Sequence, residues 1–192
     1  MLILALDTAT TTATAALVRD GQPLAEAAVL PREIYSAIDG LLEDPSELDA
    51  IAVGTGPGSF TSLRMGVAAA RAIALALELP VAGVSTLDAL AAGAPGAVPV
   101  IDARRREVFA LVEGEPLVLA PTDLPAATLV GDGALRYRPQ LEAAGAEIPP
   151  DDDPRHLPRA RFHALLARDF GPPDEVEPLY LRIPDAERSL AR

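Results

Sequence analysis

At the start of the chain, short apolar runs alternate with polar turns. Residues 2–6, 13–18 and 22–30 form the apolar runs, which are separated by a Thr-rich segment and by a turn with the sequence Arg-Asp-Gly. Short runs bounded by Gly, Asp and Thr are typical of strands joined by tight turns. This order predicts an antiparallel meander of three strands.

Helical spacing follows the meander. Ile34, Ile38, Leu41 and Leu42 recur at intervals of three or four residues, which predicts an amphipathic helix over residues 32–43. The elements predicted next are a strand at 48–53, a long helix at 61–78, a strand at 80–84 and a helix at 87–92 capped by Ser85 or Thr86. Helices therefore alternate with strands in this part of the chain.

After a Gly-Ala-Pro-Gly segment, the order of elements starts again. An apolar run at 98–101 ends in Asp102, as the run at 2–6 ends in Asp7, and a polar turn and a strand at 108–112 follow. The later predicted elements are a strand at 128–130, a short helical stretch after Gly133 and a helix at 159–169. Two halves with the same order of elements predict a duplicated unit.

The same Gly-Ala-Pro-Gly segment, at residues 93–96, is the best domain-boundary signal in the chain. We therefore predict an N-terminal subdomain at 1–96 and a smaller C-terminal subdomain with a terminal tail at 97–192. Within this second part, the acidic residues at 151–153 lie among prolines and are expected in a solvated loop.

Composition and charge restrict the chemistry. The 192-residue chain is 49% hydrophobic and 23% charged, which is typical of a folded globular protein. It contains no Cys and every basic residue is Arg, which excludes disulfides, thiolate metal sites and lysine-based mechanisms. The net charge of −12 argues against a stand-alone nucleic-acid binder, because phosphate contacts need a basic surface. We expect a cytoplasmic protein without membrane contact, since we find no signal peptide and no sufficiently long, charge-free apolar stretch.

The long helix predicted at 61–78 lacks a polar half. One face carries Leu63, Val67, Ala70 and Ile73, and the opposite face is rich in Ala and Leu. A helix that is apolar on both sides is covered on both sides. Two interpretations stay open, because the second cover is either a partner subunit or the rest of this chain. The residues predicted for a partner interface are Ile34, Ile38, Leu41, Leu63, Val67, Ala70 and Ile73.

A glycine-rich loop lies between the predicted strand at 48–53 and the long helix. The backbone N–H groups of such a loop could cradle a phosphate, but this loop lacks the lysine of a P-loop, and Ser59 occupies the third glycine position of a dinucleotide fingerprint. We favour a tight turn whose glycines allow close packing, with Ser59 or Thr61 as the helix cap. The candidate residues are Gly54, Gly56, Gly58, Ser59 and Thr61.

The turn Asp7-Thr8-Ala9-Thr10 resembles the phosphate loop of the actin/Hsp70/sugar-kinase superfamily. In that superfamily, the Asp and the hairpin amides hold a metal-bound triphosphate. Here Ala9 stands in place of the glycine, and we find no adenosine-clasping glycine motif downstream. We therefore interpret Asp7, Thr8 and Thr10 as a degenerate phosphate loop, in which Asp7 accepts hydrogen bonds from turn amides.

The histidines and the arginine run favour structural roles. His156 and His163 are seven residues apart, which does not fit the spacing of helical metal ligands, so we expect two surface histidines and no metal site. A Ser-His-Asp hydrolase lacks support because no Ser lies in a GxSxG elbow. Arg104, Arg105 and Arg106 are expected at a hairpin turn, where a basic tip could meet an acidic partner.

Five segments taken together resemble the TsaB (YeaZ-like) family. They are ILALDTAT, GTGPGSFTSLRMG, GVSTLDAL, IDARRREVF and EPLYLR, and they span residues 3–182 in the order of the family. The GPGSFT-x-LR-x-G element is the specific one among them. The resemblance implies an ASKHA (actin/Hsp70-like) α/β fold with two duplicated subdomains, each with a mixed sheet and flanking helices.

The resemblance also implies a function and a set of partners. Family members are non-catalytic relatives of TsaD, from which they differ by lacking its metal-binding HxxxH. The chain is expected to bind and activate TsaD, which transfers threonylcarbamoyl to N6 of adenosine 37 in tRNA, on a platform that also engages TsaE. Heterodimer and homodimer are both open, tRNA is expected only through the complex, and ATP, ADP and metal are expected in the partners.

Two positions depart from the family pattern near the expected partner surface. Ser62 stands where relatives usually have Gly, and Ile34-Tyr35-Ser36 stands where they tend to have a His-Ser pair. The alternative function is a free-standing ASKHA-type enzyme, either a phosphotransferase or a glycoprotease-like metallopeptidase. A phosphotransferase should keep an intact phosphate loop, and a metallopeptidase should keep paired histidines. A tRNA-binding module is a third hypothesis, against which the net charge argues.

Overall fold

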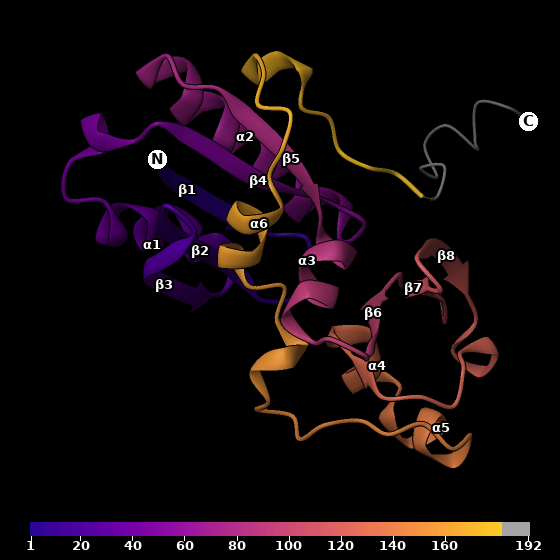
Figure 1. Ribbon diagram of the computed structural model, residues 1–192. Coiled ribbons are helices and arrows are strands. Elements are labelled where there is room, and N and C mark those ends of the chain that lie inside the picture. The colour runs from indigo at the N-terminus through magenta and orange to yellow at the C-terminus, as the bar shows by residue number, and fades with distance from the viewer. Residues whose placement is uncertain (182–192) are drawn as a thin grey trace, which may run out of the picture.

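Two mixed β-sheets organise residues 1–181, the part of the chain that the computed structural model describes (Figure 1). The first sheet has the strand order β3-β2-β1-β4-β5 and the second has the order β8-β7-β6-β9. The strands are β1 (Leu2–Asp7), β2 (Ala13–Arg19), β3 (Gln22–Val29), β4 (Ala50–Gly56) and β5 (Val81–Ser85) in the first sheet, and β6 (Val98–Asp102), β7 (Val108–Val112), β8 (Glu115–Leu119) and β9 (Leu129–Val130) in the second. The helices are α1 (Ile34–Leu41), α2 (Phe60–Leu77), α3 (Thr86–Gly93), α4 (Asp132–Arg136), α5 (Arg138–Ala143) and α6 (Ala160–Leu166). Arg182, the last residue of the EPLYLR segment, lies outside the described residues.

The second sheet repeats the topology of the first. β1 pairs antiparallel with β2 and parallel with β4, and β6 pairs antiparallel with β7 and parallel with β9. The order β8-β7-β6-β9 therefore matches β3-β2-β1-β4 strand for strand. This confirms the predicted α/β fold with two duplicated units.

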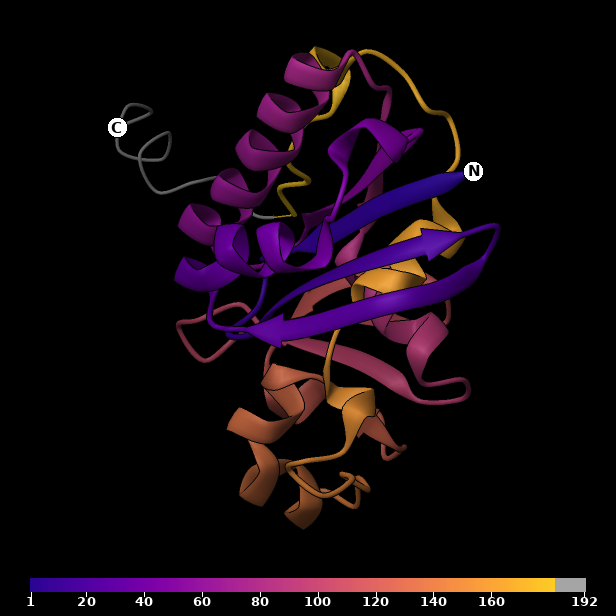
Figure 2. The same ribbon diagram turned by 90° about the vertical axis from the view of Figure 1, so that its left-hand side faces the viewer.

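Side-chain size differs between the two faces of the first sheet. In β1, Leu4 and Leu6 face α1 and α2, whereas Ala5 faces α6 on the other side. Successive side chains of a strand point to opposite faces, so the alternation of Leu and Ala makes one thick and one thin layer. Figure 2 shows α2 and α6 on opposite sides of this sheet. The thin layer allows α6 to approach the strands closely through small residues at Ala160, Ala164 and Ala167.

Helix α2 is long and apolar enough, by length and composition, to cross a membrane, contrary to our expectation for the chain. Its packing is that of a core helix. Leu63, Val67 and Ala70 are buried against the first sheet in the same core as Ile34 and Ile38 of α1. The apolar inward face of α2 thus follows from its place in the fold.

The end of the chain returns to the first sheet. The predicted boundary at residue 96 falls between the two sheets, but α6 packs on β1, β2 and β4, and so crosses back over that boundary. Residues 171–181, here called the C-terminal strap, continue along β5. Gly171 pairs with Val81, and the Leu179 N–H donates to the Thr55 carbonyl at 2.7 Å.

Two elements of the second unit have no counterpart among the predicted ones. β8 begins with Glu115-Pro116, and α5 begins with Arg138-Pro139. Both prolines follow a charged residue and favour a turn when only local sequence is considered. β8 pairs with β7 and lies at the edge of its sheet, where the missing N–H of a proline is tolerated.

Candidate functional site

The carboxylate of Asp7 is fully buried and is held by three internal groups. Its Oδ1 accepts the Ala9 N–H at 2.7 Å, and its Oδ2 accepts the Thr86 hydroxyl at 2.6 Å. The Nε2 atom of His163 lies 2.8 Å from the same Oδ2, and the exposed fraction of both side chains is 0%. A metal-bound phosphate at this carboxylate would have to displace these contacts.

Strand alternation explains why these groups meet. Asp7 is two residues after Ala5 in β1, so both side chains point to the face covered by α6, which carries His163. Thr86 is the first residue of α3, directly after β5, and its hydroxyl also accepts the Gly56 N–H at 3.2 Å. The cluster thus joins four segments that are distant in sequence.

The other two residues of the predicted phosphate loop are also buried, and Thr8 packs against α2. The Thr8 hydroxyl donates to the Ser62 carbonyl at 2.5 Å, and the Thr10 hydroxyl donates to the Thr12 carbonyl at 2.8 Å. Gly66 packs on Thr8 so closely that a Cβ atom there would lie 2.3 Å from the threonine hydroxyl oxygen. Thr8 and Thr10 are buried, and their hydroxyl groups are used within the chain.

A second carboxylate closes the loop from the other subdomain. Asp132 accepts the Thr11 N–H at 3.2 Å through Oδ2 and the Asp102 N–H at 3.0 Å through Oδ1. Burial raises the pKa of Asp132 above its ordinary value, since desolvation disfavours the charged carboxylate. Turn amides of the kind that bind phosphate are thus occupied by Asp7 at Ala9 and by Asp132 at Thr11.

The glycine-rich loop supports this packing. A Cβ atom at Gly54 would lie 1.9 Å from Oδ2 of Asp7, and one at Gly58 would lie 2.2 Å from the Ala9 carbonyl oxygen. Gly56 has a φ of 97°, a conformation that side-chain-bearing residues rarely adopt. Two of these glycines therefore allow contact with the Asp7 turn, and the third allows the backbone turn itself.

The two cap candidates of this loop differ in position. Ser59 directly precedes α2 but makes no side-chain cap hydrogen bond; its N–H donates to the Ala9 carbonyl at 2.7 Å. Its hydroxyl lies 3.2 Å from that of Ser62. Thr61 is exposed in the first turn of α2. Ser62, a departure from the family pattern, thus contacts both Ser59 and Thr8.

The prediction of two surface histidines is wrong, because both are buried. The exposed fractions are 4% for His156 and 0% for His163. The Nδ1 atom of His156 accepts the Gly131 N–H at 3.0 Å, so Nε2 carries the ring proton and donates to the Pro149 carbonyl at 3.2 Å. Among residues 1–181, no group of three or more His, Asp or Glu side chains is arranged to hold a metal ion.

The predicted partner interface requires a correction, because most of its residues lie in the chain's own core. Ile34, Ile38, Leu63, Val67 and Ala70 have exposed fractions of 5% or less. Leu41 and Ile73 are partly buried against the same core. These residues form the inward faces of α1 and α2, so they are not available to contact a partner.

The outward face of α2 is also apolar. We call it the α2 stripe, and it consists of Ala68, Ala72, Leu75 and Ala76, all of which are exposed. Leu75 has an exposed fraction of 69%, and Tyr35 on the neighbouring α1 has 53%. An exposed apolar patch of this kind marks an interaction surface in many soluble proteins.

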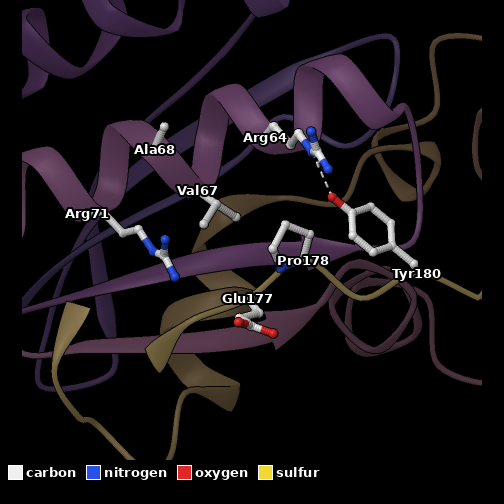
Figure 3. A pocket seen from close by; sticks show the side chains of 7 residues that line it. All are labelled: Arg64, Val67, Ala68, Arg71, Glu177, Pro178 and Tyr180. Carbon is white, nitrogen blue, oxygen red and sulfur yellow. Dashed lines mark hydrogen bonds between the residues drawn. The ribbon is translucent and has the colours of Figure 1, made fainter. Parts of the chain in front are cut away.

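A groove of about 390 Å³ borders the stripe, between α2 and the C-terminal strap (Figure 3). Nε of Arg64 donates to the Tyr180 hydroxyl at 2.9 Å, and the Arg64 guanidinium carbon lies 3.9 Å from the Phe60 ring centroid. Arg71 donates to the carbonyls of Asp174 and Val176, at 2.7 Å each. Arg64 and Arg71 of α2 thus bind the C-terminal strap next to the α2 stripe.

Three residues contact the Asp7 turn although the sequence analysis did not predict these contacts. They are Thr86, His163 and Asp132. Local sequence shows none of these contacts, because each partner is at least 79 residues away from the turn residue that it meets. One signal was present for His163. The alanines at 160, 164 and 167 have helical spacing, and they match the small face of β1 and β2 in size.

Comparison with known proteins gives consistent findings. The family model described as "TsaD: tRNA N6-adenosine threonylcarbamoyltransferase" matches residues 27–131. The chain is 30% identical to the Bacillus subtilis tRNA threonylcarbamoyladenosine biosynthesis protein TsaB, over 97% of this chain and 96% of the relative. The solved structure of YeaZ from Pseudomonas aeruginosa matches 94% of this chain over 99% of its own length, with 27% identity and a TM-score of 0.74. The ethanolamine utilization protein EutJ of Carboxydothermus hydrogenoformans, at 12% identity over 87% and 90% of the chains and a TM-score of 0.53, is similar in fold alone. The fold is thus the ASKHA-like fold expected from the sequence.

Proposed function

The chain belongs to the TsaB family and contains a TsaD-like domain, and from this premise we propose that it is a non-catalytic subunit that binds and activates TsaD. In this role it takes part in the synthesis of threonylcarbamoyladenosine in tRNA, as the names of its relatives indicate. TsaD then carries out the transfer of threonylcarbamoyl to N6 of adenosine 37, and this chain acts in the cytoplasm as its partner.

The observation that carries the proposal is the closed phosphate loop. In the enzymes of the ASKHA superfamily, the aspartate and amides of this turn hold a metal-bound triphosphate. Here the Asp7 carboxylate contacts Ala9, Thr86 and His163. The Thr11 N–H donates to Asp132. Carboxylates of the chain itself occupy the positions that an anionic ligand needs, which favours a binding subunit over an enzyme. ATP, ADP and metal are accordingly assigned to the partners.

The α2 stripe is the surface that we assign to TsaD. It is apolar and exposed, and its border carries Phe60, Arg64 and Tyr180. Aromatic residues and arginine are enriched among the residues that dominate binding energy at protein interfaces. The same surface serves a homodimer when TsaD is absent, because two copies would bury the same stripe. TsaE would join the complex after TsaD is bound.

Reconstitution tests the proposal directly. The purified chain is mixed with TsaD from the same organism, association is followed by size-exclusion chromatography, and threonylcarbamoylation of tRNA is assayed with and without the chain. We expect a complex and an activity that depends on this chain. A chain that stays monomeric and leaves the activity unchanged would refute the proposal, and titration with ATP would then test the alternative of a free-standing enzyme.

Three alanine-to-arginine variants distinguish surface from core. Ala72 is exposed in the α2 stripe, so Ala72→Arg should fold normally but lose more than about a hundredfold in affinity for TsaD, since a charge is buried without a partner. Ala70 has an exposed fraction of 0%, so Ala70→Arg should unfold the chain. The matched control is Ala143→Arg, at an exposed position of α5 in the second subdomain. Equal binding by the Ala72 and Ala143 variants would exclude the α2 stripe as the interface.

A further inference from the structure

A run of three arginines forms a strained turn between β6 and β7. Arg104, Arg105 and Arg106 have φ values of 62°, 55° and 62°, so three successive residues with long side chains are in the left-handed region. This conformation is unfavourable for residues other than glycine. Strain of this kind persists where the surrounding structure enforces it, and it is concentrated at functional sites.

A buried carboxylate enforces the turn. Oδ1 of Asp102 accepts the Arg104 N–H at 2.9 Å, and its Oδ2 lies 3.1 Å from the Arg104 guanidinium. The same oxygen lies 3.3 Å from Nε of Arg136, which comes from the end of α4. Guanidinium groups from two elements thus converge on one aspartate. We call Arg104, Arg105, Arg106 and Arg136 the arginine patch.

The ion pairs of Arg104 and Arg136 differ from those of Arg19 and Arg138 in how far the partner carboxylate is exposed. The Asp102 side chain has an exposed fraction of 4%, whereas those of Arg104 and Arg136 have 59% and 52%. By contrast, Arg19 pairs with Glu47 and Arg138 pairs with Asp151, whose side chains are exposed by 58% and 82%. At the patch, the positive groups face solvent and the negative group lies beneath them. The patch is therefore locally basic on a protein with a net charge of −12.

The chemistry of the patch fits a phosphate backbone. The planar guanidinium group binds phosphate oxygens through paired hydrogen bonds. Tyr137 lies beside Arg136, with 5.8 Å between the guanidinium carbon and the ring centroid, and aromatic rings next to arginines are typical of RNA-binding surfaces. We infer that the arginine patch contacts the phosphate backbone of the RNA substrate while this chain is in its complex. The inference rests on the proposed function, since the chain alone is too acidic to hold RNA well.

The test measures tRNA binding by the complex of this chain with TsaD at several salt concentrations. Arg106→Gly and Arg136→Gln should each weaken tRNA binding. Each should also make the slope of log K against log salt concentration less steep, by about one unit for each phosphate that is no longer bound. Arg32→Gln is the matched control, because Arg32 is exposed by 75% and lies before α1 in the first subdomain. It should leave both quantities unchanged.

Arg106→Gly adds a readout that a merely structural role would not give. Glycine adopts the left-handed conformation without strain, so this variant should have a higher melting temperature than the wild type while it binds tRNA more weakly. Arg106→Lys keeps the charge and should keep most of the salt dependence. Loss of tRNA binding by Arg32→Gln to the same extent would overturn the inference, because the effect would then follow net charge alone.

Size-exclusion chromatography of each variant with TsaD separates the two proposals. If the patch variants no longer associate with TsaD, the patch binds an acidic protein and the inference is overturned. If they associate and bind tRNA like the wild type, it is overturned as well. If the wild-type chain forms no complex, the proposed function fails. Direct titration of the chain alone with tRNA at low salt must then show weaker binding by the patch variants than by the wild type and Arg32→Gln, or the inference fails too.

Discussion

A substitution at Thr86 is the clearest test of whether contacts within the chain hold the Asp7 carboxylate. Its side chain is fully buried, its hydroxyl donates to the Asp7 carboxylate at 2.6 Å, and it accepts the Gly56 N–H at 3.2 Å. Thr86→Val replaces the hydroxyl by a methyl group of similar size. The variant therefore removes both hydrogen bonds and leaves no cavity.

The expected cost follows from these two bonds. A hydrogen bond to a charged group contributes about 1.5–3 kcal/mol, and a buried N–H left without a partner costs about 1–3 kcal/mol. We therefore expect Thr86→Val to lower the free energy of unfolding by about 3 kcal/mol or more. For a chain of this size, such a loss lowers the melting temperature by about 6–12 °C.

Urea unfolding of the wild type, Thr86→Val and Thr86→Ser gives the measurement. Serine keeps the hydroxyl and loses one methyl group, so its cost should stay near about 1 kcal/mol. If valine costs no more than serine, then Asp7 does not depend on Thr86. The assignment of Asp7 to a structural cluster would then be untenable, and with it the argument that the phosphate loop is closed.

Three further predictions concern stability. Gly66→Ala should destabilise the chain in thermal unfolding, because the added Cβ would lie 2.3 Å from the Thr8 hydroxyl oxygen; an unchanged melting temperature would contradict this contact. Burial raises the pKa of Asp132, so its favourable contribution is present below its ordinary pKa of 3.8 and disappears as pH rises through the raised value. Urea titrations should therefore show the wild type losing stability relative to Asp132→Asn as pH rises, and a flat difference would refute this. Asp153→Asn should show the opposite trend, because hydrogen bonds from Arg155 lower the pKa of Asp153 to about 2, and the stability it contributes above pH 3.8 disappears as pH falls towards that value.

The local elements of the fold were predictable because most of their signals lie within one segment. The meander β1–β3, the long helix α2 and the restart at β6 all follow from apolar periodicity and from turn residues. The repeated order of elements was sufficient to predict the duplicated unit. β8 and α5 were missed because a proline near the start of each one resembles a turn signal.

The faces of α2 could not be assigned from the sequence. Leu63, Val67 and Ala70 make one apolar side, and Ala72 and Leu75 make the other, so hydrophobicity alone does not say which side meets the sheet. The structure resolves this by size and position, since the larger residues at 63 and 67 fill the core with the leucines of β1. The partner surface that we propose therefore lies on the opposite side of the helix from the one predicted.

The contacts of Asp7 were only half predictable. The bond from the Ala9 amide is local, because an aspartate in a turn commonly accepts the N–H two residues ahead. The contacts with Thr86 and His163 depend on which helices cover the α6 face of the sheet. That choice depends on a match of small residues across distant segments, and the spacing of the alanines at 160, 164 and 167 shows one side of this match but not its partner.

The return of α6 to the first sheet has a consequence for biosynthesis. The core layer of the second subdomain that contains Val100 and Leu141 is complete once Ile148 has been made, whereas the α6 face of the first sheet stays uncovered until residues 160–167 leave the ribosome. During synthesis, Asp7 lacks His163 and the alanines of β1 and β2 are exposed to chaperones and to other nascent chains. The sheet that is translated first is therefore covered on this face only after most of the chain has been made.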